Sequence, residues 1–204
     1  MNARNFQREL DRLLERLAAE GRVPRLFLHS CCAPCSSYVL EYLSKYFEIT
    51  VFYYNPNIYP PKEYDERLAE VRRLVSEMEF AHPVTVVAGA YDPALFFDAV
   101  KGLEAEKEGG ARCERCFRLR LMEAARLAKD GGYDYFTTTL TVGPKKDARL
   151  LNQLGEEIGS MYGVAYLNSD FKKKNGHFRS LELSEQYGLY RQDYCGCVFS
   201  RRGG

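Results

Sequence analysis

Three cysteines lie close together directly after a short apolar segment of the chain. Residues 24–29 read Pro-Arg-Leu-Phe-Leu-His, which is typical of a buried strand, and residues 36–46 have the spacing of a helix. The stretch between them, His29-Ser-Cys-Cys-Ala-Pro-Cys-Ser-Ser37, is therefore expected to form the turn from strand to helix. α/β proteins usually hold their ligands at such turns. Here the turn carries thiols in place of phosphate-binding glycines.

The alternation of apolar strands and amphipathic helices continues along the chain. Further strands are expected at 49–54, 84–88, 135–140 and 164–167, and helices at 2–20, 62–79, 112–129, 147–162, after Pro93 and at 180–187. This order predicts a three-layer α/β fold with a mostly parallel five-stranded sheet between helices. We expect a single α/β domain over 1–204, with an N-terminal helix in 1–21 and a basic, cysteine-containing segment, 168–204, that packs near the site.

Three loops would leave the sheet at the same edge. They are the thiol turn, the tyrosine-bearing loop at 55–61 and the Gly-Pro-Lys-Lys loop at 141–146, which follow the first, second and fourth expected strands. Ligands of open α/β sheets bind at the carboxyl ends of the strands. The three loops are therefore expected to converge on one pocket.

The cysteine content points to metal or redox chemistry. The chain has seven cysteines and shows neither a signal peptide at residues 1–20 nor an apolar stretch long enough to cross a membrane, so a cytoplasmic protein without a membrane partner is expected. Clustered thiols in the reducing cytosol are typical of metal or redox sites. Residues 111–204 carry 16 Lys/Arg and 11 Asp/Glu, a net charge of +5, which is compatible with an anionic substrate.

Two C-x-x-C pairs provide four candidate ligands. Cys32 and Cys35 form one pair, and Cys113 and Cys116 form the other at the expected start of a helix, where the helix dipole favours thiolates. Four thiolates suit an iron–sulfur cluster or a structural zinc ion. A thioredoxin-type dithiol is a further alternative.

The remaining thiols leave several roles open. Cys31 adjoins Cys32, so the two side chains are expected to point in different directions, and Cys31 could lie in the core, hold a second metal or touch substrate. Cys195 and Cys197 flank a glycine and could form a disulfide, bind metal or lie at a turn. His29 at a strand end is either a hydrogen-bonded core residue or a functional one.

Several motifs together resemble the cobalamin-independent epoxyqueuosine reductases of the QueH type. They are the thiol turn at 29–37, Cys113-Glu-Arg-Cys116, Thr138-Thr-Leu-x-x-x-Pro144-Lys-Lys146, Phe171-Lys-Lys-Lys-Asn175 and Tyr190-Arg-Gln-Asp-Tyr-Cys-Gly-Cys197. The resemblance spans about residues 24–200. It implies reduction of epoxyqueuosine to queuosine at the wobble position of tRNA, the last step of queuosine biosynthesis. It also implies a sheet like that of the PP-loop, or adenine nucleotide α-hydrolase-like, superfamily.

The resemblance also implies a cofactor and its ligands. A [4Fe-4S] cluster is expected on Cys32, Cys35, Cys113 and Cys116, with Cys31 at an adjacent iron or on the substrate side. Removing the epoxide oxygen takes two electrons, and a cluster passes electrons singly, so an external electron donor is expected as well. The glycines of the PP-loop are missing, which predicts that the chain does not use ATP.

The resemblance also implies roles for other residues. Cys31 and His29 are the candidate catalytic residues, and Cys195 and Cys197 are candidates for a redox pair or disulfide. The candidate substrate-binding residues, which would face the modified base and the phosphates of the anticodon loop, are Tyr53, Asn55, Tyr59, Arg115, Lys145, Lys146, Lys172, Lys173 and Arg191. Two other functions stay open: a PP-loop-derived tRNA sulfur-transfer enzyme and a zinc-stabilised, non-catalytic RNA-binding module.

Overall fold

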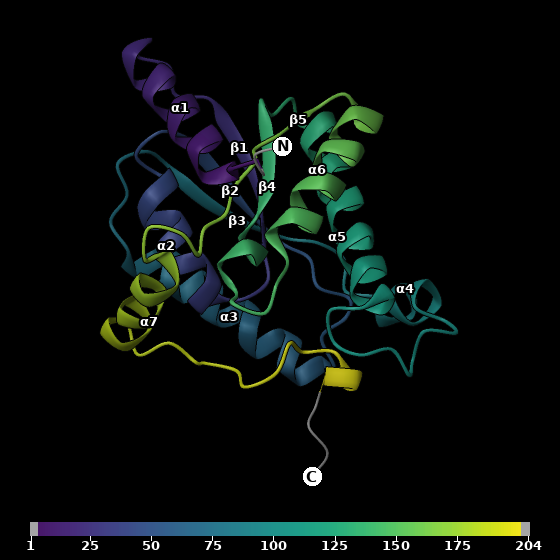
Figure 1. Cartoon of the computed structure of the whole chain (residues 1–204). Helices are drawn as coiled ribbons and strands as arrows, with labels where there is room; N and C mark the ends of the chain where they lie inside the picture. The colour runs from purple at the N-terminus through teal and green to yellow at the C-terminus, as the bar shows by residue number, and fades with distance from the viewer. Residues whose placement is uncertain (1–3, 201–204) are drawn as a thin grey trace.

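A computed structural model describes residues 4–200 and shows one parallel sheet of five strands (Figure 1). The strands are β1 (Arg25–Ser30), β2 (Glu48–Tyr53), β3 (Val84–Ala88), β4 (Tyr135–Thr138) and β5 (Ala165–Tyr166). Their order across the sheet is β3-β2-β1-β4-β5, and every neighbouring pair is parallel. The predicted α/β fold with a parallel five-stranded sheet is therefore confirmed.

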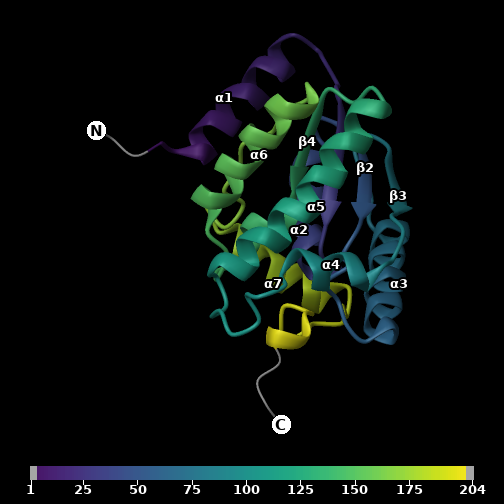
Figure 2. The same cartoon turned by 90° about the vertical axis from the view of Figure 1, so that its right-hand side faces the viewer.

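Helices cover both faces of this sheet (Figure 2). They are α1 (Phe6–Ala19), α2 (Ala33–Leu43), α3 (Pro61–Glu77), α4 (Pro93–Ala99), α5 (Ala111–Asp130), α6 (Ala148–Tyr162) and α7 (Gly176–Gln186). Alternate residues of a strand face opposite sides of the sheet. Accordingly, Leu26 and Leu28 of β1 pack in the core formed with α1, α2 and α3, whereas Phe27 packs in the core formed with α5 and α6.

Most predicted element bounds differ from the structure by one to four residues. The strand expected at 135–140 ends at Thr138 and continues as a 3-10 helix, Thr139–Val142, because the Thr138 hydroxyl accepts the Leu140 N–H and caps the new turn. The second helix begins at Ala33, not residue 36, with Cys32 as its N-cap. The last long helix begins at Gly176, not residue 180. Residues 2 and 3 of the first predicted helix lie outside the described residues.

The sheet order determines where a ligand can bind. From β1 the chain moves to β2 on one side, and β4 later joins β1 on its other side. A crevice opens at the carboxyl end of the strand where the direction of winding changes. The thiol turn leaves β1 at this point. Within residues 4–200, no helix is both long enough and apolar enough to cross a membrane.

Candidate functional site

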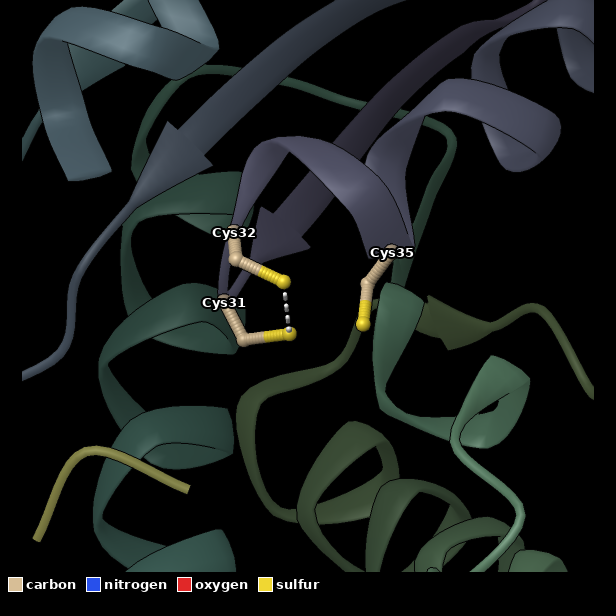
Figure 3. Close-up of side chains that lie close together, drawn as sticks. All are labelled: Cys31, Cys32 and Cys35. Carbon is tan, nitrogen blue, oxygen red and sulfur yellow. Dashed lines mark hydrogen bonds between the residues drawn. The ribbon is translucent and has the colours of Figure 1, made fainter. Parts of the chain in front are cut away.

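The first group of thiols lies where β1 leads into α2, with Cys31 and Cys32 in the turn and Cys35 in the first turn of the helix. The Cys31 and Cys32 sulfurs are 3.7 Å apart, and the sulfurs of Cys31, Cys32 and Cys35 all lie within 4.8 Å of one another (Figure 3). The expectation that Cys31 and Cys32 point in different directions is wrong, because the chain bends from strand to helix at Cys32. Two thiolates on one tetrahedral metal ion are about 3.8 Å apart when the metal–sulfur bonds are about 2.3 Å. The three thiols can therefore bind a single metal ion.

The pKa values of the three thiols of the first group shift in different directions. Hydrogen bonds with Cys32 and Cys35 hold the pKa of the Cys31 thiol well below its usual value. The same contacts, followed by burial, raise the pKa of Cys32 and Cys35. Of the three thiols, Cys31 is therefore the one that gives up its proton most readily.

A second group of thiols surrounds a small adjoining cavity. Cys113 and Cys116 come from the first two turns of α5, and Cys195 and Cys197 come from the C-terminal segment. All seven cysteines are free thiols. The structure thus places Cys32 and Cys35 with Cys31, and Cys113 and Cys116 with Cys195 and Cys197. The four-cysteine ligand set expected from the sequence draws one pair from each group and stays a prediction.

Helix α3 holds the C-terminal segment over the site. We call residues 187–200 the C-terminal strap. Arg73 donates to the carbonyl oxygens of Tyr187 and Gly188, and Glu70 accepts the backbone N–H of Tyr190. Further along, Arg67 Nη1 donates to the carbonyl oxygen of Cys195 at 3.4 Å. This series of contacts along one helix brings Cys195 to the thiol turn, where it lines the cavity described next.

The larger of the two cavities beside the thiols has a volume of about 250 Å³ and lies next to the first thiol group. We call it the main cavity. Its wall contains thiols, cations and part of the strap: Cys31, Cys32, Cys35, Arg67, Glu108, Arg120, Leu140, Gly143, Pro144, Lys145, Lys146, Gln192, Asp193, Tyr194, Cys195 and Ser200. Lys146 donates to Glu108 at 3.1 Å and to the Cys195 sulfur at 3.4 Å. Burial lowers the pKa of Lys146, but its interactions with Cys195 and Glu108 more than reverse this, so the pKa is raised and the side chain stays cationic.

Two basic residues expected to bind substrate lie at the cavity, and the others are elsewhere. Lys145 and Lys146 line the main cavity. Lys172 lies in an adjoining open cavity of about 820 Å³ that shares Lys146 with the main one. The remaining basic candidates are exposed at other places, with Arg191 beside the end of α7: Arg115, Lys173 and Arg191.

The candidate residues of the second strand and its loop are mainly structural. Tyr53 is fully buried, and its hydroxyl donates to the carbonyl oxygen of Tyr64. Asn55 is also buried, where its amide donates to the carbonyl oxygen of Ser30 and its oxygen accepts from Arg120. Tyr59 is exposed and contacts the ring of Phe97.

His29 lies in the core beneath the thiols. Its Nε2 lies 3.0 Å from the carbonyl oxygen of Tyr54, which can only accept, so Nε2 carries the hydrogen. Nδ1 then accepts from the Thr138 hydroxyl at 2.8 Å. Burial, and next the charge of Arg120, lower the pKa of His29 to about 3. His29 is absent from the wall of the main cavity, so the contacts favour the core interpretation that the sequence left open.

The low pKa of His29 predicts that the protein loses stability in mild acid. The unfolded chain takes up a proton near pH 6.5, whereas folded His29 does so only near its pKa of about 3. The free energy of unfolding should therefore fall by about 1.4 kcal/mol per pH unit below about pH 6. That corresponds to roughly 3–6 °C in Tm. Comparing wild type and His29→Gln at each pH isolates this contribution, and parallel Tm curves for the two proteins would contradict it.

Two buried arginines at the cavity were missed by the sequence interpretation. Arg67 and Arg120 are 2% and 1% exposed, and both line the main cavity. A signal was present in the sequence, because each occupies an apolar stripe of its helix: Arg67 lies between Tyr64 and Val71, and Arg120 between Cys116 and Ala124. Arginine is usually exposed, so such a position indicates a buried anion or a paired charge.

Fold and site together define a three-layer α/β protein with a cysteine-rich site of the metal-binding type at the carboxyl edge of its sheet. The family model for epoxyqueuosine reductase QueH matches residues 26–203. The chain belongs to this family of oxidoreductases.

Curated relatives match over most of their length. The epoxyqueuosine reductase QueH of Staphylococcus epidermidis is 42% identical over 200 residues, which cover 96% of this chain and 84% of that protein. The protein of the same name from Staphylococcus aureus is 42% identical, with 96% and 83% covered. The one from Streptococcus pyogenes is 40% identical, with 97% and 78% covered.

Proposed function

We propose that the chain reduces epoxyqueuosine to queuosine at the wobble position of tRNA. The reaction takes two electrons and two protons, opens the epoxide to an alkene and releases its oxygen as water. The observation that carries the proposal is the arrangement of seven thiols around two adjoining cavities at the carboxyl end of β1, in a member of this family. Family membership supports the substrate, and the thiols support redox chemistry on a metal.

The residues around the cavities fit an anionic iron–sulfur centre. Among residues 4–200, three buried donor groups beside the thiols have no hydrogen-bond partner, and all three belong to cations: Arg67, Arg112 and Arg120. We infer that a [4Fe-4S] cluster is held by Cys32, Cys35, Cys113 and Cys116, with Cys31 at an adjacent iron. When bound, these centres would supply electrons singly and a Lewis acid for the epoxide oxygen.

The protein's own residues would orient the substrate. Lys145 and Lys146 lie on the wall of the main cavity beside the thiols, where they can contact phosphates of the anticodon loop. The strap would exclude water from the reacting carbon atoms, since Tyr194 and Cys195 form part of the cavity wall. An external donor would deliver the electrons. A tRNA substrate supports a cytoplasmic location for the reaction.

The proposal is tested on protein purified without oxygen. We expect a brown protein with the iron of one [4Fe-4S] cluster and one further ion, which converts epoxyqueuosine in tRNA to queuosine when a chemical reductant is supplied. Removing the iron with a chelator should abolish conversion, and rebuilding the centre from iron and sulfide should restore it. A colourless protein with stoichiometric zinc and no conversion would favour the RNA-binding module and overturn the proposal.

A further inference from the structure

Unpaired buried polar atoms gather around the thiols. Within residues 4–200, six buried side-chain atoms lack a hydrogen-bond partner, and four belong to residues that line the two thiol cavities. These four are Asn57 Oδ1, Arg67 Nη2, Arg112 Nε and Arg120 Nη2. Buried polar groups in folded proteins are nearly always paired, because an unpaired one loses the hydrogen bonds it made with water. Three of the four are arginine N–H donors, which points to a bound group that accepts hydrogen bonds.

Arg120 has the most central position among these residues. It lines both cavities, and Cys31 lies on the wall of one while Cys113 lies on the wall of the other. Its Nε donates to the carbonyl oxygen of Cys116 at 3.1 Å, and its Nη1 donates to Asn55 Oδ1 at 3.3 Å. Asn55 is in turn fixed to the end of β1, because its amide donates to the carbonyl oxygen of Ser30 at 2.8 Å.

These contacts fix the plane of the guanidinium and leave Nη2 unused. Both groups that accept from Arg120 are neutral, whereas Arg67, the other cation on the main cavity with an unpaired nitrogen, is paired with Glu63 at 2.7 Å. Among the described residues no carboxylate pairs with Arg120, whereas thiols of both groups lie on the walls of the two cavities that it lines. A buried charge is costly unless an opposite charge accompanies it.

We propose that Arg120 compensates the negative charge of the thiolate-bound metal centre and raises its reduction potential, with Nη2 donating to a sulfur of that centre. This inference rests on the proposed function, since it requires a redox-active metal. Reduction adds negative charge to the centre, and a nearby cation stabilises the reduced form more than the oxidised one. Arg120 acts through the metal centre, so it is a positioning residue. Asn55, which was expected to bind substrate, would instead orient the guanidinium group of Arg120.

The test compares charge with shape at one position. Arg120→Met removes the charge, Arg120→Lys keeps it, and Arg118→Met is the matched control on the same helix, because Arg118 pairs at the surface with Glu157. Each protein is purified without oxygen, its iron is counted, and its visible spectrum is followed in a redox titration. At a fixed potential, the ratio of reduced to oxidised centre in Arg120→Met should fall about tenfold, which is 59 mV for a one-electron couple. Arg120→Lys should shift much less, and Arg118→Met should match wild type.

Each outcome decides for or against the proposal. A folded Arg120→Met that has lost its iron, together with an Arg120→Lys that keeps it, also supports a need for charge. Loss of iron from both variants, with Arg118→Met intact, would show that only the shape of the side chain matters and would overturn the proposal. An unchanged potential with a raised KM for the tRNA would assign Nη2 to a substrate oxygen instead. A wild-type protein without redox-active metal would overturn the proposed cofactor and this inference with it.

Discussion

Replacing Cys113 with serine is expected to abolish both the iron centre and the reduction of epoxyqueuosine. Cys113 is buried in the first turn of α5, where its sulfur accepts the backbone N–H of Gly109 at 3.2 Å. Iron–sulfur clusters are held by thiolates, and a serine hydroxyl does not replace one. Changes to groups that only orient metal ligands already cost about 10–100-fold. The loss of a ligand should therefore lower turnover by more than about 100-fold, which an assay on tRNA with iron analysis would measure.

Cys197→Ser provides the matched control for this substitution. Cys197 lies on the wall of the same small cavity as Cys113 but is outside the proposed ligand set, so the variant should keep its iron and colour. An iron-loaded Cys113→Ser would show that Cys113 is not a ligand. Loss of iron from both variants would instead assign the centre to the four cysteines that surround this cavity. The pair of variants thus distinguishes the proposed ligand set, with one thiol pair from each group, from a ligand set made of the four cysteines around the small cavity.

The sequence predicted the sheet well because its signals there are local. Apolar runs of four to six residues between amphipathic helices locate all five strands, and the β3 bounds agree with the structure. The end of β4 was misplaced because it depends on a tertiary contact. The Thr138 hydroxyl that caps the following 3-10 helix also bonds His29 on β1, and no window of sequence contains both residues.

The site was predicted in its thiols and only partly in its polar residues. A clustered cysteine indicates metal or redox chemistry by its residue type alone, so all seven cysteines could be identified from the sequence as candidate site residues. Tyr53 and Asn55 were expected to bind substrate, but the side chain of Tyr53 lies in the core and that of Asn55 is buried, where it bonds Ser30 and Arg120. Arg67 and Arg120 were missed although each lies in the apolar stripe of its helix, because only the folded chain shows that both line the cavity beside the thiols.

Substituting alanine for Gly196 is expected to displace the C-terminal strap and lower activity by about a hundredfold. Gly196 lies between Cys195 and Cys197 and has a φ of +107°, a conformation that residues with a Cβ rarely adopt. An added Cβ would lie 2.8 Å from Ile58 Cγ1 and 3.0 Å from Arg67 Nη1. The strap must therefore move away, which breaks the 3.0 Å bond from the Tyr59 N–H to the Gly196 oxygen. Misplacing a reacting group by about 1 Å costs about 100-fold in rate.

Gly188→Ala is the control that distinguishes the effect of moving the strap from the effect of backbone strain alone. Gly188 also has a positive φ, of 54°, but an added Cβ would meet no atom within 4 Å. The control thus carries a strain of about 1–2 kcal/mol without a clash, and it should keep its turnover. Steady-state rates on tRNA and the rate of proteolytic cleavage within 187–200 measure the two effects. Faster cleavage and lost turnover in Gly196→Ala alone would follow from a displaced strap. Full turnover would mean that the chemistry needs neither Cys195 nor Cys197 at the cavity, because both neighbours of Gly196 must move with it.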